Sequence, residues 1–125
     1  MLDKKVIEKL AVLLEKIKQE NILIVVEGFK DKKSLISLGF SHKRIFTLYK
    51  KPLFRVVEDV VKTEKRVVIL TDLDSEGKKL YSKLKRDLSE RGIYIDNKLR
   101  NFLFKYTKLR QVEGLKNYID RNNQL

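Results

Sequence analysis

Two kinds of hydrophobic pattern follow one another along the chain. Short runs of branched apolar residues predict buried strands of a parallel sheet, and they occupy residues 22–26, 44–49, 67–71 and 93–95. Apolar residues at helical spacing predict helices over residues 3–20, 31–38, 53–61, 75–91 and 98–109, with a further amphipathic segment at 112–119. Strands that alternate with helices indicate βαβ units with right-handed crossovers. We therefore expect an α/β fold: a mainly parallel sheet of about four strands, helices on both faces, and extra helices at both ends.

Residues at the predicted boundaries agree with this pattern. Asp31 is placed to open the second helix, and Gly39 is placed to end it. Pro52 stands where proline favours a helix start, and Gly92 ends the helix that precedes the last strand.

Three carboxylates follow two of the predicted strands. Glu27 comes directly after the run at 22–26, and Asp72 and Asp74 come after the run at 67–71. Ligands of open parallel sheets bind at the carboxyl ends of the strands, so this fold can bring the three side chains together. The sequence alone does not establish that the two strands are neighbours. Acids at the ends of buried strands are costly unless they are paired, and a divalent metal is the obvious partner.

The types of residue present favour magnesium at these acids. Mg²⁺ prefers oxygen ligands and is commonly held by one or two carboxylates together with water and substrate phosphate. The chain has no cysteine and a single histidine, His42, which argues against zinc. We predict Asp72 and Asp74 as ligands of Mg²⁺, for which Mn²⁺ could substitute, and Glu27 as a general acid or base. The alternative is structural, with Asp74 capping the helix that follows.

Composition adds a preference for polyanions. The chain has 125 residues, enough for one domain over residues 1–125, and its formal net charge is +12. Residues 77–110 alone contain eleven Lys/Arg and three Asp/Glu. Such a basic balance attracts nucleic acid. The alternative is a lysine-rich surface of the kind found in proteins from hot environments.

Five basic residues are candidates for contacts with nucleic-acid phosphates: Lys30, Lys78, Lys79, Arg100 and Lys105. Arg100 and Lys105 fall on the basic face of the helix predicted to begin at residue 98. Ordinary solvated side chains are the alternative for each of them. No base-reading module such as a zinc finger is visible. With no signal-like start and no long apolar run, we expect a soluble, cytoplasmic protein without a membrane partner.

Around the acids the sequence resembles the Toprim domain, which topoisomerases, bacterial primases and several nucleases share. In that family a strand is followed by a Glu-Gly pair, here Glu27-Gly28, and a later strand by Asp-x-Asp, here Asp72-Leu73-Asp74. The resemblance implies a three-layer α/β/α, Rossmann-like fold with its core at residues 22–95, an N-terminal helix at 3–20 and a basic helical extension at 97–125. In length and in its C-terminal tail the chain most resembles the small stand-alone archaeal Toprim proteins.

The resemblance also implies roles for individual residues. Glu27 would be the general acid or base and could also reach the metal, and Asp72 and Asp74 would bind Mg²⁺. Glu76 matches the third acid of an Asp-x-Asp-x-Glu form and could complete a second metal site, while Gly77 matches a small residue often found there. We further expect Gly28 to permit a close backbone approach or an unusual dihedral angle.

These observations predict Mg²⁺-dependent phosphoryl transfer on nucleic acid, in the form of a nuclease that acts on RNA or DNA. Hydrolysis needs the least machinery, whereas topoisomerases and primases use further domains for which this length leaves no room. Two alternatives stay open. The chain could bind nucleic acid without cutting it, or it could be a subunit whose activity needs a protein partner in nucleic-acid processing.

Overall fold

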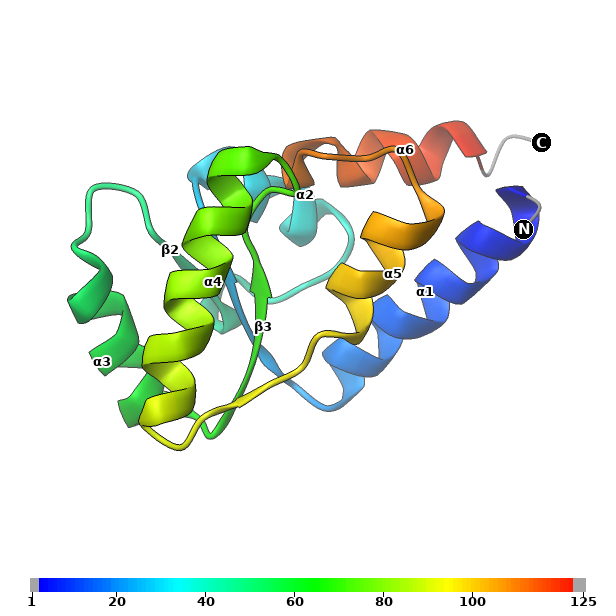
Figure 1. Ribbon diagram of the computed structural model, residues 1–125. Coiled ribbons are helices and arrows are strands. Elements are labelled where there is room, and N and C mark those ends of the chain that lie inside the picture. Colours follow the sequence, from blue (N-terminus) through cyan, green and yellow to red (C-terminus); the bar gives the residue numbers. More distant parts are fainter. Residues whose placement is uncertain (1–2, 123–125) are drawn as a thin grey trace.

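Four parallel strands form one sheet in the computed structural model, which describes residues 3–122 (Figure 1). The order of the strands across the sheet is β2-β1-β3-β4. Their bounds are Leu23–Val26 for β1, Ile45–Thr47 for β2, Arg66–Leu70 for β3 and Tyr94–Ile95 for β4. The predicted parallel sheet of about four strands is therefore confirmed.

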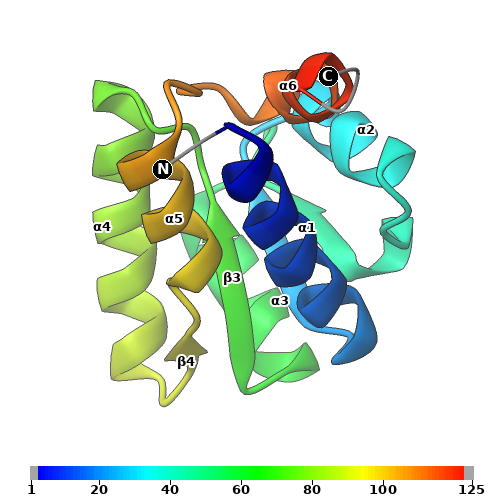
Figure 2. The same ribbon diagram turned by 90° about the vertical axis from the view of Figure 1, so that its right-hand side faces the viewer.

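Helices cover both faces of the sheet, as the sequence predicts. On one face lie α1 (Asp3–Gln19), α2 (Phe29–Ser37), α5 (Lys98–Tyr106) and α6 (Leu115–Asn122). On the other face lie α3 (Leu53–Thr63) and α4 (Ser75–Glu90). Figure 2 shows α1 and α5 in front of β3, with α3 behind it. Short 3₁₀ turns span His42–Arg44 and Val112–Gly114.

The alternation of side chains along each strand explains why two helical layers form. Ile24 and Val26 point into the core with α1, α2, α5 and α6, whereas Leu23 and Val25 point into the core with α3 and α4. All four side chains are fully buried. Successive residues of a strand face opposite sides, so an uninterrupted apolar strand needs cover on both. None of the helices within residues 3–122 has the length and apolar character needed to cross a bilayer.

Several predicted helix boundaries differ from the structure by one to three residues, and two of these differences have a clear local cause or consequence. The helix predicted over 98–109 ends at Tyr106, because Thr107 leaves the helical conformation and uses its hydroxyl as a stop. Its Oγ1 donates to the Leu103 carbonyl at 2.6 Å and accepts from the Leu109 N–H at 3.2 Å. The second helix begins at Phe29 rather than Asp31, so Asp31 lies one turn inside it.

The two strands that precede the acids are neighbours. β1 pairs with β3, with Val26 opposite Leu70 at their carboxyl ends. From β1 the chain passes through α2 to β2 on one side of β1, while β3 lies on the other side. This is the topological switch point of the sheet, where open α/β folds bind ligands. It faces the top of Figure 1.

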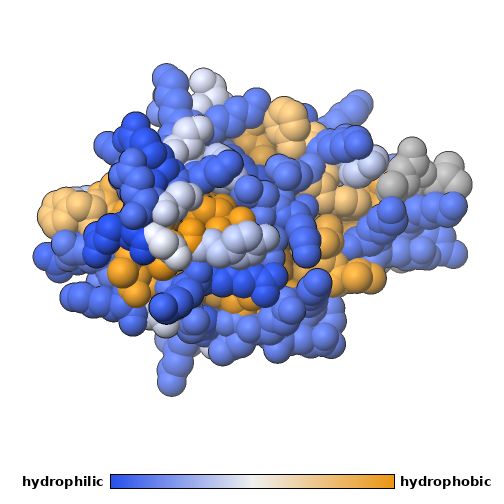
Figure 3. All heavy atoms as spheres, turned by 60° about the horizontal axis from the view of Figure 1, so that its bottom comes forward, coloured by the Kyte–Doolittle hydropathy of each residue, from blue (hydrophilic) through white to orange (hydrophobic). Residues whose placement is uncertain are grey.

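The opposite end of the molecule, seen when the bottom of Figure 1 comes forward, has a mostly hydrophilic surface. Figure 3 shows hydrophilic residues over most of this face and hydrophobic atoms in patches between them. Tyr94 of β4 is one of the exposed aromatic residues, and the Arg66 guanidinium lies over its ring. Both belong to the paired positions where β3 and β4 begin.

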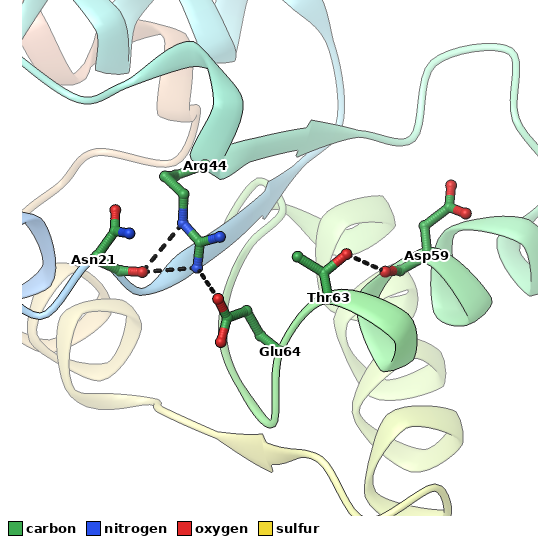
Figure 4. Close-up of polar contacts among 5 residues, drawn as sticks. All are labelled: Asn21, Arg44, Asp59, Thr63 and Glu64. Atoms are coloured by element: carbon green, nitrogen blue, oxygen red, sulfur yellow. Dashed lines mark hydrogen bonds and ion pairs between the residues drawn. The ribbon is translucent and has the colours of Figure 1, made fainter.

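Arg44 ties together three chain segments at this amino-terminal edge (Figure 4). Its Nε and Nη2 donate to the Asn21 carbonyl at 3.1 and 2.7 Å, just before β1. Its Nη2 also lies 2.6 Å from Glu64 Oε1, just after α3. Asn21 has a φ of 53°, in the left-handed region that non-glycine residues rarely adopt. The guanidinium therefore holds a strained turn in place.

We expect Arg44→Met to lower the free energy of unfolding by about 1–2 kcal/mol, toward the low end of the usual value of hydrogen bonds to charged groups, because the bonds to Asn21 are exposed to solvent. The measurement is urea unfolding followed by circular dichroism. Lys43→Met, at an exposed position of the same 3₁₀ turn, is the matched control and should stay within about 0.5 kcal/mol of the wild type. Equal midpoints for all three proteins would contradict the role given to Arg44.

Candidate functional site

Glu27 and Asp72 meet at the carboxyl edge of the two central strands. The Glu27 Oε2 atom accepts a hydrogen bond from the Asp72 backbone N–H at 2.6 Å. The paired strand ends at Val26 and Leu70 place the next residues of each strand side by side. The structure thus brings together two of the acids that the sequence singled out.

Asp72 and Asp74 each accept a hydrogen bond from a different backbone segment. Asp72 Oδ1 accepts from the Val112 N–H at 2.8 Å, which ties the strand end to the C-terminal part of the chain. Asp74 Oδ1 accepts from the Gly77 N–H at 2.8 Å and is the N-cap of α4. The capping role considered for Asp74 is therefore real. A carboxylate has a second oxygen, so capping leaves each aspartate able to bind something else.

Two further acids belong to the cluster, and the sequence analysis missed them as site residues. Asp31 is 7% exposed, and its Oδ2 accepts from the Gly28 N–H at 2.9 Å. Its pKa is raised by burial and then by the negative charges of Asp72 and Glu113, against hydrogen bonds from backbone N–H groups. An acid in the first turn of a helix that starts directly after Glu27-Gly28 was the available signal for Asp31. Glu113 comes close only through the fold.

Burial and repulsion from neighbouring acids both raise the pKa values of Glu27 and Asp72. Burial raises the pKa of Glu27 most, the charges of Asp72, Asp31 and Asp74 add to the rise, and the Asp72 N–H opposes it. Burial likewise raises the pKa of Asp72, with Asp74 and Glu113 adding to the rise, while the Val112 N–H and Arg100 lower it. A group of carboxylates whose negative charges repel one another favours a bound cation.

Arg100 is not on an exposed basic face, so its place in the structure differs from the phosphate contact predicted for it. The side chain is buried, and Nη1 and Nη2 donate to the carbonyls of Thr71 and Asp72 at 2.5 and 3.0 Å. Its guanidinium also lies 4.4 Å from the centre of the Tyr81 ring. Arg100 holds the backbone of the strand end that carries Asp72. Its spacing from Leu103 puts it on the buried stripe of α5, a signal that the sequence contained.

The donor set suits Mg²⁺ bound in part by water or phosphate. Among residues 3–122, no three acidic or histidine side chains converge closely enough to hold an ion by themselves. Mg²⁺ needs only one or two carboxylates when water and substrate phosphate supply the other oxygens. Asp72 and Asp74 each have one oxygen that the hydrogen bonds above do not use. The residues present therefore fit such an ion.

A cleft of about 890 Å³ opens beside Asp74. Its walls come from α2, α6 and the segment between α5 and α6. Two acids, Asp74 and Glu113, line it together with six basic residues: Lys30, Lys33, Lys108, Arg110, Lys116 and Arg121. We call it the basic cleft. Of the five predicted phosphate contacts, Lys30 lies here.

The other predicted residues lie away from the basic cleft. Three of the predicted phosphate contacts, Lys78, Arg100 and Lys105, line a second hollow, and the Lys78 Nζ lies 4.5 Å from the centre of the Phe104 ring. Glu76 is 82% exposed on the first turn of α4, with Lys79 at 4.0 Å. The structure therefore groups Glu27, Asp72 and Asp74 with Asp31 and Glu113. It leaves Glu76 facing solvent.

The glycine that the site needs is Gly77, not Gly28. Gly28 has an extended backbone with a φ of −140°, and a Cβ there would meet only Asp31 Oδ2 at 3.9 Å. The expectation of an unusual dihedral or close approach at Gly28 was wrong. At Gly77 a Cβ would lie 1.9 Å from the Asp72 carbonyl oxygen. The first turn of α4 therefore packs directly on the backbone of Asp72.

Comparison with known proteins agrees with the resemblance to the Toprim domain. The family model described as Toprim-like matches residues 24–106. A UPF0292 protein of the archaeon Methanocaldococcus jannaschii is 34% identical over 119 residues, which cover 91% of this chain and 92% of that protein. A UPF0292 protein of Thermoplasma volcanium is 33% identical, covering 78% of this chain and 82% of that one. The resemblance to small archaeal proteins is thus confirmed.

Two solved structures share the fold. A protein from Aquifex aeolicus superposes with a TM-score of 0.73 at 31% identity, covering 88% of this chain and 94% of its own. The Aquifex aeolicus primase, in a structure of its zinc-binding and RNA polymerase domains, superposes with a TM-score of 0.51 at 23% identity. That match covers 86% of this chain and 27% of the primase chain. At this identity the primase supports the fold alone.

We expect Gly77→Ala to lower the free energy of unfolding by about 3 kcal/mol or more, since a methyl group would overlap a backbone carbonyl that cannot move aside. Gly28→Ala is the matched control and should be tolerated, because its Cβ would make only an ordinary contact. Thermal unfolding of both variants checks the difference. Equal melting temperatures would mean that α4 does not pack on Asp72 as described.

Proposed function

Because the chain belongs to the Toprim-like family, we propose that it is a Mg²⁺-dependent nuclease that hydrolyses phosphodiester bonds in RNA or DNA. One observation carries this proposal: Glu27, Asp72 and Asp74 gather at the switch point of the sheet, beside a cleft lined by six basic residues. Carboxylates that can hold a cation and cations that can hold phosphates are what such a reaction requires.

Asp72 and Asp74 would hold the ion through their second carboxylate oxygens. Their first oxygens stay on the backbone N–H groups of Val112 and Gly77, which keeps both side chains aimed at the site. A bound Mg²⁺ would supply charge stabilisation for the transferring phosphoryl group. The exposed Glu76 would join only if a second ion bound near the start of α4.

Glu27 would move the proton. Hydrolysis forms a bond between phosphorus and a water oxygen, breaks the bond to the leaving oxygen, and transfers a proton from the water side to the leaving oxygen. A carboxyl group whose pKa is raised by burial and by neighbouring acids suits that exchange. The bond from the Asp72 N–H fixes Oε2, so Oε1 is the atom that would take or give the proton.

The basic cleft would bind the phosphates of the strand on either side of the bond that is cut. Lys30 and Arg110 lie along it with Asp74, so one bound strand could contact both the cations and the acidic cluster. Contacts of this kind recognise the backbone rather than the bases. They fit RNA and DNA equally well.

We expect Asp72→Asn/Asp74→Asn to reduce Mg²⁺-dependent cleavage roughly a thousandfold, as the loss of about 4 kcal/mol of transition-state stabilisation would. Asparagine keeps a side-chain oxygen that can accept from Val112 and Gly77, so the fold should survive. The measurement is cleavage of labelled structured RNA, single-stranded DNA and double-stranded DNA in Mg²⁺ and in Mn²⁺.

Glu58→Gln/Asp59→Asn on α3 makes the same change of net charge outside the cluster and should cut as the wild type does. Undiminished cleavage by the Asp72/Asp74 variant would rule out the proposed site. Binding of nucleic acid without cleavage by the wild type, in either metal, would instead favour the non-catalytic binding module.

Metal binding has a second readout in thermal stability. The pKa values of Glu27, Asp31 and Asp72 are higher in the folded protein than in the unfolded chain. Protonation of these groups therefore stabilises the fold fully at a pH below their unfolded-state pKa values, and this stabilisation is lost as the pH rises through their folded-state pKa values. A cation bound to the deprotonated acids should restore part of that lost stability. At a free concentration ten times its Kd, Mg²⁺ should raise the free energy of unfolding by about 1.4 kcal/mol, which corresponds to roughly 5 °C in melting temperature.

The increase of melting temperature on adding Mg²⁺ should be large at pH 7.5 and small near pH 4. At pH 7.5 it should be smaller in the Asp72→Asn/Asp74→Asn variant than in the Glu58→Gln/Asp59→Asn variant. Differential scanning calorimetry with and without Mg²⁺ provides the measurement. A rise of equal size in both variants would place the ion elsewhere.

A further inference from the structure

Two aromatic rings stand exposed as a pair at the carboxyl edge of the sheet. Phe29 is 63% exposed and Tyr49 is 48% exposed. Their ring centroids lie 5.1 Å apart at an interplanar angle of 65°. Neither ring contributes to the two hydrophobic cores. The pair therefore lies outside both cores and faces solvent, where a ligand can reach it.

The position of the pair is set by the elements that build the acidic cluster. Phe29 is the first residue of α2 and stands two residues after Glu27. Tyr49 follows β2 in a turn fixed by the Leu48 N–H donating to the Val26 carbonyl at 3.0 Å and the Lys51 N–H donating to the Leu48 carbonyl at 3.1 Å. Both rings thus lie at the edge of the sheet where β1 delivers Glu27.

The turn that carries Tyr49 has an unusual backbone. Lys50 has a φ of 55° although it is not a glycine. Residues held in this region cost free energy and tend to persist at functional sites. Lys50 also places its Nζ 5.3 Å from the centre of the Tyr49 ring. The turn presents an aromatic ring and a cation together.

The charges around the pair favour one kind of occupant. Lys30 follows Phe29, and Lys50 and Lys51 follow Tyr49; all three are exposed. An apolar protein surface laid over the rings would bring these ammonium groups against groups that cannot pair with them. A nucleic-acid strand would place bases on the rings and phosphates beside the lysines. Flat aromatic faces next to cations are the usual means of binding single strands.

We propose that Phe29 and Tyr49 form a stacking platform for unpaired bases, so that the substrate of this site is single-stranded nucleic acid or the single-stranded part of a longer molecule. In a duplex the base faces are covered by their neighbours, and a platform of this kind gains nothing. The inference rests on the proposed action on nucleic acid and adds the class of strand. It does not depend on which metal binds or on whether cleavage occurs.

The test measures binding without cleavage. Fluorescence anisotropy in EDTA reports the affinity for a labelled 15-nucleotide single strand of mixed sequence, as RNA and as DNA, and for the matching duplexes. A parallel series in the Asp72→Asn/Asp74→Asn background removes two negative charges from the site. The variants are Phe29→Ala, Tyr49→Ala, Phe29→Leu/Tyr49→Leu and Phe29→Tyr/Tyr49→Phe. Tyr94→Ala is the matched control, an exposed aromatic residue with an arginine on its ring at the opposite edge of the sheet.

Each alanine substitution should weaken single-strand binding about tenfold, within the range measured for loss of one base–aromatic stack. Duplex binding should change less than twofold. The leucine pair keeps apolar bulk but removes both rings, so it should weaken single-strand binding at least as much as either alanine substitution, and the aromatic exchange should keep wild-type affinity. Tyr94→Ala should bind as the wild type does.

Unchanged single-strand affinity in the leucine pair would overturn the proposal and leave a protein partner as the occupant of the rings. Equal losses on single strands and duplexes would overturn it as well. The proposed nuclease activity is judged separately by the cleavage assay. The binding assay can therefore support base stacking even if no cleavage is seen, and the cleavage assay can support a nuclease even if the rings do not stack bases.

Discussion

The hydrogen bond from the Asp72 backbone N–H to the Glu27 carboxylate is the constraint on which the site depends. It joins the ends of β1 and β3, whose side chains fill the cores on both faces of the sheet. Neither residue can shift without disturbing both cores. Burial of both acids carries a cost, seen in the raised pKa of each, and the charges of neighbouring acids add to it. Apolar packing far from the charges offsets that cost.

The partners of the acids are almost all backbone N–H groups. Glu27, Asp31, Asp72 and Asp74 each accept one. These donors orient a carboxylate without cancelling its charge, so the cluster stays negative. Among residues 3–122 the one buried cationic side chain is Arg100, and it donates its hydrogen bonds to the carbonyls of Thr71 and Asp72 rather than to the carboxylates. It therefore fixes the backbone and softens the repulsion, while leaving the acids open to a cation from outside.

The sequence predicted those features that depend on neighbours along the chain. Apolar runs located all four strands to within one or two residues, and the acids after them marked the edge of the sheet. Features that depend on individual atomic contacts rather than on the pattern of residues were missed. Thr107 stops a helix that periodicity would continue, and Arg100 follows the buried stripe of its helix although its charge suggested solvent. The resemblance implied a small residue at position 77, but its physical reason, a carbonyl five residues earlier that a Cβ would overlap, is not revealed by composition.

The C-terminal segment is part of the site rather than an appendage. The Arg110 carbonyl accepts from the Leu73 N–H at 2.7 Å, and the next hydrogen bond along the segment runs from Val112 to Asp72. Farther on, the Lys116 N–H donates to Ser34 Oγ of α2 at 3.2 Å. Arg110 and Lys116 of this segment, with Ser34 of α2, also line the basic cleft. One stretch of backbone therefore positions a carboxylate on its inner side and carries cations on its outer side. Because both functions share this stretch, a nucleic-acid strand bound by the cations would be held close to the acids, which is the geometry that the proposed chemistry on a polyanion would require.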